Sequence, residues 1–183
     1  MALLGCYGGS TMQPLSVPPT DSDHVLGRLD ARVVIVEYGD YDCPHTRRAH
    51  ANLKQLIAEA EGGLALVFRH FPLRHLHQNA QRLAELMQAI AEPSKYWEAH
   101  ERLMAQRRMS LEVAEQELTA LGISTRVLAE HSAGAALAVQ SDVDRGLADG
   151  VHSTPSFFFN GAPHDGKYDV DTLRQQLVAA PQR

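Results

Sequence analysis

The alternation of apolar and polar positions divides the chain into an opening strand–helix–strand unit, a long helical stretch and a closing strand–strand–helix unit. Residues 33–38 form a β-branched run that is long enough for one buried strand. Apolar residues then recur at helical spacing from Pro44, which suits a first helical turn, to the glycine pair at 62–63, which ends the helix. A second apolar run over 64–71 predicts another strand. This order of strand, helix and strand favours a right-handed parallel unit.

The middle of the chain, residues 75–151, is rich in good helix formers and carries apolar stripes at helical spacing. Ser110 is a suitable N-cap for one of these helices, and residues 135–150 predict a further one. We expect the stripes to be core faces rather than a cofactor-binding surface. They comprise Leu83, Leu86, Met87, Ile90, Tyr96, Trp97, His100, Leu103, Met104, Leu111, Ala114, Leu118 and Leu121.

The strand pattern returns at 156–159 and is followed by an Asn-Gly turn. We expect a short hairpin partner over 164–168 and a final amphipathic helix after Asp169. The predicted fold class is α/β, with a helical domain inserted between the two halves of the sheet domain. The predicted boundaries are 1–27 for a flexible N-terminal leader, 28–74 and 152–183 for the sheet domain, and 75–151 for the inserted helical domain.

Composition excludes several classes of protein. The chain has 183 residues, a formal net charge of −5 and two cysteines. Two cysteines are too few for a disulfide scaffold or a Cys-rich zinc site, and the acidic balance argues against a nucleic-acid partner. No apolar run approaches the ~20 residues that span a bilayer, so no membrane partner is expected. His70, His75 and His77 lack the spacing of a metal site, so no metal is predicted; the oligomeric state is left open.

The N-terminus lacks the basic and apolar regions of a secretory signal, which favours a cytoplasmic address. Residues 3–6, Leu-Leu-Gly-Cys, look like a bacterial lipobox, so a periplasmic or lipoprotein address is the alternative if the true start lies upstream. Cys6 is expected to be a mobile free thiol.

Cys43 is the candidate nucleophile. It follows the first strand and, with Pro44, opens the first helix. A helix N-terminus presents unpaired N–H groups and a partial positive charge, which stabilise a thiolate and make it reactive. His45, Arg47 and Arg48 would add positive charge nearby. A buried, inert cysteine is the alternative.

Thr154–Pro155 is the second local feature, directly before the Phe-rich strand. A proline at the start of a strand cannot donate to the ladder. The X-Pro bond there is either cis or trans, and trans is the commoner state.

Four segments occur in an order that resembles the DsbA-like branch of the thioredoxin superfamily, over residues 33–177. The resemblance implies a thioredoxin fold split by a helical insertion and a bacterial thiol–disulfide oxidoreductase. It implies that Cys43 is an exposed active-site thiol. It also implies that Thr154–Pro155 is a cis-proline loop facing that thiol, with Pro44, Thr154 and Pro155 binding an extended substrate. The four segments are Val36–Pro44 (VEYGDYDCP), Phe68–Leu73 (FRHFPL), Tyr96–His100 (YWEAH) and Ser153–Gly161 (STPSFFFNG).

The departure from the family lies at Thr46, which occupies the fourth position of the usual Cys-X-X-Cys motif. An intramolecular active-site disulfide cannot form, so the predicted activity is monothiol exchange, in which an external thiol such as glutathione releases Cys43. The predicted catalytic residues are Cys43 as nucleophile, His45 as thiolate stabiliser, and Thr46, which either bonds the thiolate or is a mere spacer. Glutathione is expected as a co-substrate with no tightly bound cofactor, and the expected partners are protein or glutathione thiols and disulfides.

Two other functions stay open. One is a non-redox, thioredoxin-like module that binds peptides. The other is a glutathione-dependent transferase or isomerase, as in the kappa-class glutathione transferases. Arg69, Arg74 and Arg82 could bind an anionic ligand such as glutathione, although a solvated basic rim is the favoured interpretation.

Overall fold

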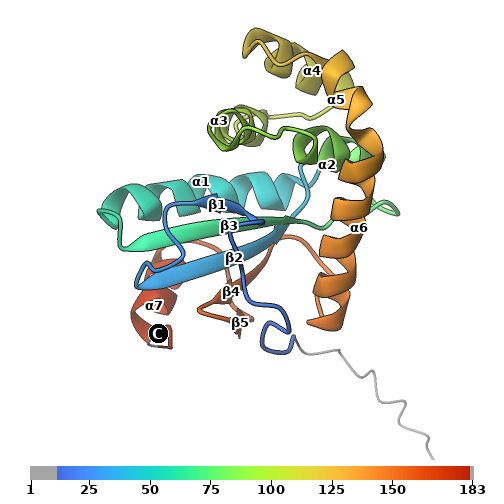
Figure 1. Ribbon diagram of the computed structural model, residues 1–183. Coiled ribbons are helices and arrows are strands. Elements are labelled where there is room, and N and C mark those ends of the chain that lie inside the picture. The colour runs from blue at the N-terminus through green and yellow to red at the C-terminus, as the bar shows by residue number, and fades with distance from the viewer. Residues whose placement is uncertain (1–11, 182–183) are drawn as a thin grey trace, which may run out of the picture.

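The computed structural model describes residues 12–181, and its centre is a five-stranded sheet in the order β1-β3-β2-β4-β5 (Figure 1). β2 and β3 are parallel, and the other three pairings are antiparallel. The parallel pair requires a crossover, which helix α1 (Pro44–Glu59) supplies. The predicted strand–helix–strand unit is therefore confirmed. The strands are β1 (His24–Leu26), β2 (Val33–Gly39), β3 (Leu64–His70), β4 (Ser156–Phe159) and β5 (Ala162–His164).

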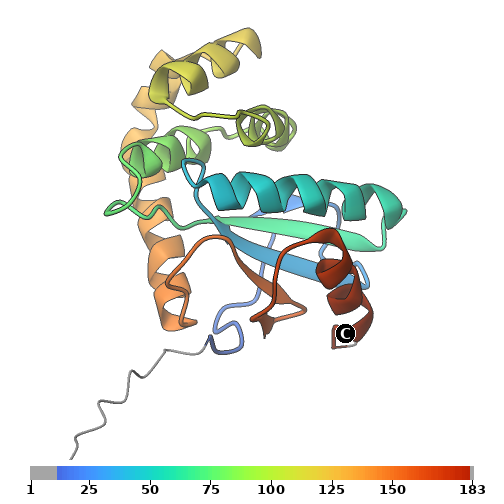
Figure 2. The same cartoon turned by 180° about the vertical axis from the view of Figure 1, so that it is seen from behind.

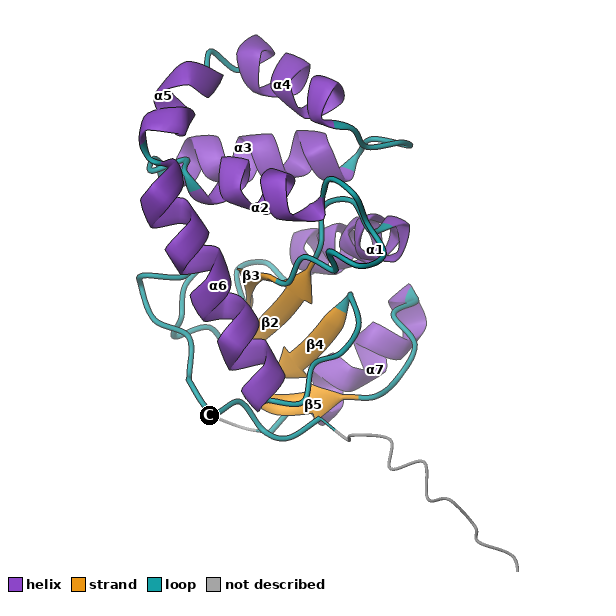
Figure 3. Ribbon diagram, turned by 90° about the vertical axis from the view of Figure 1, so that its right-hand side faces the viewer, coloured by secondary structure: helices purple, strands orange, loops and turns teal. Residues whose placement is uncertain are grey.

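The helices cover both faces of this sheet. α1 and α7 (Val170–Ala179) pack on one face, and the C-terminal part of α6 (Ser132–Ala148) crosses the other (Figures 2 and 3). Four helices form a block beyond α1 (Figure 1). This is the predicted α/β architecture, with helices inserted between its two halves. The block contains α2 (Ala80–Gln88), α3 (Pro93–Met104), α4 (Leu111–Ala120) and α5 (Thr125–Glu130).

Side chains of β2 and β3 alternate between two buried layers, as the pleat of a strand requires. Ile35, Leu66 and Phe68 belong to the layer beneath α1, which we name the α1 face. Val36 and Val67 belong to the opposite layer, the α6 face. Because both faces are covered, every residue of β2 and β3 is buried.

The predicted flexible leader is wrong for residues 12–27. Within it, β1 pairs antiparallel with β3, with Val25 opposite Val67. Further upstream, the Gln13 N–H donates to the Asp149 carbonyl at 2.9 Å. Residues 12–20 thus form an N-terminal strap along the α6 face. Residues 1–11, with the lipobox-like tetrad and Cys6, lie outside the described residues.

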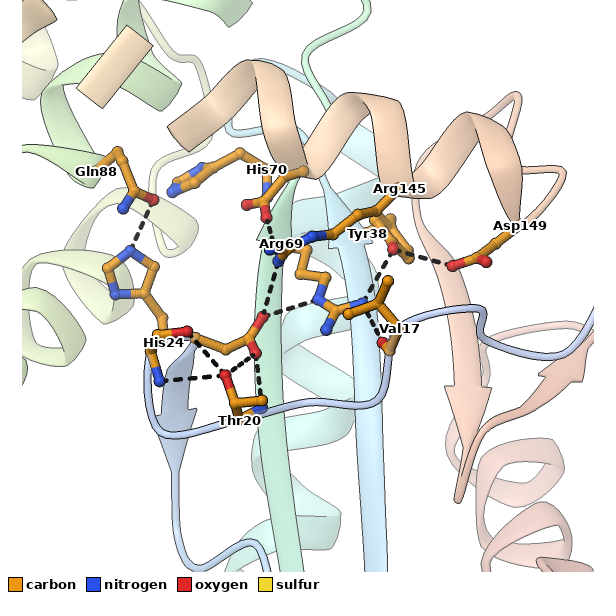
Figure 4. A network of polar contacts seen from close by, with 12 residues as sticks. Val17, Thr20, His24, Tyr38, Arg69, His70, Gln88, Arg145 and Asp149 are labelled. Carbon is orange, nitrogen blue, oxygen red and sulfur yellow. Dashed lines mark hydrogen bonds and ion pairs between the residues drawn. The ribbon is translucent and has the colours of Figure 1, made fainter. Parts of the chain in front are cut away.

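A buried arginine ties the strap to the sheet (Figure 4). Arg69 Nε donates to Asp23 Oδ1 at 2.8 Å, and Nη1 donates to the Val17 carbonyl at 3.1 Å and to Tyr38 Oη at 3.2 Å. The Tyr38 hydroxyl donates in turn to Asp149 Oδ2 at 3.2 Å. The Arg69 side chain has no exposed surface (0%), so it belongs neither to a solvated rim nor to an anion site.

Smaller differences concern the ends of elements. The hairpin partner of β4 is residues 162–164 rather than 164–168, and the short helix α5 was not predicted. The Ser110 cap is confirmed, because its Oγ accepts from the Val113 N–H at 3.2 Å. Within residues 12–181, no helix combines the length and the apolar character that crossing a membrane demands.

Candidate active site

Cys43 is the N-cap of α1, with Pro44 in the first helical turn. Extended backbone at Cys43 (φ −75°, ψ 119°) turns the chain from the loop after β2 into the helix. Its Sγ donates to the carbonyl of Thr154 at 3.4 Å. The residue is only 3% exposed, so the expectation of an exposed thiol is wrong. The thiol is covered because the loop before β4 packs against it.

The loop that covers the thiol contains the predicted proline. The Thr154–Pro155 peptide bond is cis, as expected from the family resemblance. β4 pairs antiparallel with β2, and Ser156 lies opposite Tyr38. The loop before Ser156 therefore lies at the C-terminal end of β2, and the chain continues from this end to Cys43. A cavity of about 420 Å³ opens beside Pro155. The structure therefore brings together Cys43, Thr154 and Pro155, as predicted.

Asp40 organises the loop that leads to the thiol, and sequence reasoning missed it. Its buried Oδ2 accepts from the Leu73 N–H at 3.0 Å and from His77 Nδ1 at 2.7 Å. Its Oδ1 accepts from the Asp42 N–H at 2.8 Å, and its carbonyl accepts from the Cys43 N–H at 3.1 Å. One carboxylate thus fixes the Cys43 loop against the segment that follows β3.

Thr46 is fully buried in the first turn of α1. Its Oγ1 accepts from the Asp40 N–H at 3.3 Å. No hydrogen bond joins it to Cys43 within the part of the chain that the structure describes. The hydroxyl that replaces the second cysteine therefore supports the loop backbone, which is neither of the two alternatives left open for it, a bond to the thiolate or a mere spacer.

The predicted cations point in different directions. His45 is exposed, and its Nδ1 shares a 2.6 Å hydrogen bond with the hydroxyl of Tyr168. Arg47 Nη1 donates to the Tyr41 carbonyl at 2.7 Å. Arg48 lines a groove between α1 and residues 165–169. The Arg47 backbone N–H donates to the Cys43 carbonyl at 3.3 Å, as the first turn of α1 requires, but among the described residues none of these three side chains makes a hydrogen bond with the Cys43 thiol.

The histidines that were weighed as metal ligands have other roles. His77 bonds Asp40, and burial lowers the pKa of His70 well below 6.5, which keeps its ring neutral. Within residues 12–181, no group of three or more His, Cys, Asp or Glu side chains has the arrangement of a metal site.

Comparison with known proteins agrees with the fold. A family model described as Thioredoxin matches residues 19–179. The oxidised form of BdbD from Bacillus subtilis has a TM-score of 0.75 at 20% identity, over 93% of this chain and 97% of that one. A thioredoxin-like oxidoreductase from Silicibacter pomeroyi DSS-3 has a TM-score of 0.74 at 26% identity, over 87% of this chain and 92% of that one.

A second group of relatives matches nearly all of this chain, but over only a small part of each relative's own length. The Na⁺/H⁺ antiporter NhaA 1 of Salinispora arenicola is 34% identical over 98% of this chain. The chain spans only 28% of that antiporter's length. The similarity therefore concerns one segment of the antiporter.

Proposed function

Since the chain belongs to the thioredoxin family and has the DsbA-like form of its fold, we propose that it catalyses thiol–disulfide exchange through the single thiol of Cys43. The observation that carries this proposal is the contact between Cys43 Sγ, at the N-terminus of α1, and the carbonyl before the cis-proline. A thiolate formed there gains from the partial positive charge of the helix end. Pro44, Thr154 and Pro155 would form the surface that receives the substrate.

A single thiol dictates a two-step exchange with an external thiol. The Cys43 thiolate attacks the glutathionyl sulfur of a mixed disulfide, so that a Cys43–glutathione disulfide forms and the substrate leaves as a thiolate, which takes up a proton. A second glutathione thiolate, having released its own proton, then attacks the glutathionyl sulfur. Cys43 leaves as a thiolate and oxidised glutathione forms. The substrate thiol is released, and the one free glutathione is the reductant; the other half of the oxidised glutathione is the glutathionyl group of the mixed disulfide.

Burial of the thiol adds one requirement. Sγ is covered by the loop that contains Thr154, so a substrate disulfide must displace this contact to reach the sulfur. The freed Thr154 carbonyl is then available to accept a hydrogen bond from the backbone of an extended substrate.

The mass of the intact protein after treatment with oxidised glutathione tests the proposal. We expect one added glutathione on the wild type and on Cys6→Ser. Cys43→Ser should take up no glutathione. Turnover of a glutathionylated peptide should likewise be lost in Cys43→Ser alone. Equal turnover by the wild type and Cys43→Ser would refute the enzymatic proposal. Fractionation of the producing cells separates the cytoplasmic address from the periplasmic alternative.

The low exposure of Cys43 also supports the second candidate, a peptide-binding module without redox turnover. In that case, Cys43→Ser retains affinity for an extended peptide while neither protein turns over a mixed disulfide. Titration of both proteins with the same labelled peptide separates the two functions.

A further inference from the structure

A groove of about 530 Å³ lies between α1 and the loop that leads into α7. We name it the α1–α7 groove; Arg48 and Asn52 line it from α1, and residues 165–169 line it from the opposite side. His45, Arg48 and Asn52 are spaced by three and four residues, so they share one face of α1. This face begins two residues after Cys43.

The walls of this groove are fixed by polar contacts that do not use its charges. The Tyr168 hydroxyl bonds His45 Nδ1 at 2.6 Å, and the Asn52 side-chain amide donates to the Tyr168 carbonyl at 2.8 Å. Asp169 is occupied as the N-cap of α7, where its carboxylate accepts from the Thr172 N–H at 3.0 Å. The shape of the groove is thus set before any ligand enters.

Three charged side chains of the groove take no part in these contacts. Arg48, Lys167 and Asp165 are exposed and make no hydrogen bond or salt bridge with another residue of the described chain. Some exposed arginines pair with neighbouring carboxylates, as Arg28 does with Asp30 and Arg174 does with Glu59. Others, such as Arg107 and Arg108, have no such pair among the described residues and line no groove with a second cation. Two cations and one anion that make no side-chain hydrogen bond or salt bridge among the described residues therefore line a single groove. The pKa of the neighbouring Asp169 is lowered by the Thr172 N–H and also by the charge of Lys167.

We infer that the α1–α7 groove holds the charged ends of a thiol peptide with two carboxylates and one ammonium group, the class to which glutathione belongs. Arg48 and Lys167 bind the carboxylates, and Asp165 binds the ammonium group. This inference rests on the proposed function and assigns a binding site for its co-substrate.

Reach is consistent with this assignment. At about 1.5 Å per residue along a helix, Arg48 lies roughly 7 Å along the axis from Cys43. An extended tripeptide spans about 10 Å, so a thiol on its central residue leaves roughly 5 Å of chain to either end, and the long Arg48 side chain must reach over the remainder. A ligand whose sulfur meets Cys43 can therefore place a carboxylate beside Arg48.

The test compares two disulfides that differ in charge. Mass spectrometry follows the rate at which Cys43 takes up glutathione from oxidised glutathione, and the rate at which it takes up the neutral thiol of 2-hydroxyethyl disulfide. In Arg48→Ala/Lys167→Ala, the rate with oxidised glutathione should fall about tenfold, as expected for a loss of roughly 1.4 kcal/mol, while the rate with the neutral disulfide stays within about twofold of wild type. Arg107→Ala/Arg108→Ala, with the same change in net charge at exposed positions between α3 and α4, should leave both rates unchanged.

The outcomes distinguish the groove assignment from the proposed function of Cys43. Equal slowing with both disulfides, or no slowing with either, overturns the groove assignment while Cys43 still reacts. A wild type whose Cys43 takes up neither thiol overturns the proposed function itself. Adding Asp165→Asn to Arg48→Ala/Lys167→Ala should lower the rate with oxidised glutathione by a further two- to threefold, because the ammonium group of the ligand loses its partner.

Discussion

The two faces of the sheet treat buried ionisable groups in opposite ways. On the α6 face, Arg69 is charged and bonded to Asp23, Tyr38 and a backbone carbonyl (Figure 4). On the α1 face, Glu37 is fully buried, and neither oxygen of its carboxyl has a hydrogen-bond partner among the described residues. Burial raises the pKa of Glu37 to about 8.

The difference follows from what each face packs against. The strap brings the Val17 carbonyl to Arg69, and Asp23, shortly after the strap, brings a carboxylate. Glu37 instead lies between Phe68 and Phe157 of the neighbouring strands. A buried charge is tolerated only where it is paired; otherwise the group becomes neutral. The Arg69 network on the α6 face therefore depends on an intact ion pair, whereas Glu37 on the α1 face makes stability depend on pH.

Removing the paired cation should have the largest effect. Arg69→Met leaves Asp23 buried without its main partner, and we expect the free energy of unfolding to fall by about 3–5 kcal/mol. Urea denaturation followed by circular dichroism measures this loss. Arg28→Met removes an exposed arginine that is also paired with an aspartate, and it should show no measurable change. A loss of similar size in both variants would remove the contrast between buried and exposed pairs.

The unpaired acid should make the protein less stable as pH rises. The pKa of Glu37 is raised from 4.5 to about 8, so its contribution to stability is complete below pH 4.5 and is lost as the pH rises towards 8. At about 1.4 kcal/mol per pKa unit, the loss between pH 5 and 8 is of the order of 3 kcal/mol. Glu37→Gln should flatten this part of the profile, measured by urea denaturation at several pH values. The exposed Glu98→Gln is the matched control, and a profile unchanged by Glu37→Gln would contradict the prediction.

A smaller effect of opposite sign is expected from His70, also on the α1 face. Because burial lowers its pKa well below 6.5, its contribution is present above pH 6.5 and is lost as the pH falls below that value. Between pH 6.5 and 5, stability should therefore fall, because the unfolded chain takes up a proton that the folded chain does not. His70→Phe should reduce the acid sensitivity in the same denaturation series, and the exposed His75→Phe should not. Identical acid slopes for both variants would show that His70 is not the group that titrates.

Sequence patterns predicted those elements that the local sequence alone is sufficient to specify. The β-branched run of β2, the apolar run of β3 and the Ser110 cap were all recognisable before any contact was known. β1 was missed because its three residues acquire burial only by pairing with β3. Three residues, two of them apolar, are too short a run to carry a record of such a distant partner.

The site divides in the same way. Cys43 and Pro155 were found from motifs, whereas the role of Asp40 depends on Leu73 and His77, more than thirty residues away. The burial of Cys43 likewise depends on the loop at Thr154, 111 positions further along the chain. Residue type and local order predicted the candidate nucleophile, but not the contacts that support and cover it.

Helix α6 has a mechanical consequence. Its 17 residues form a strut about 25 Å long that runs from the helical block to the sheet. At its C-terminal end, a Cβ on Gly146 would lie 2.8 Å from the ring of Phe71 and 3.0 Å from that of Tyr38. The strut is thus seated directly on the sheet beside the Arg69 network. A displacement of α6 would therefore disturb its contact with Tyr38, the residue that pairs with Ser156 directly after the loop that covers the thiol.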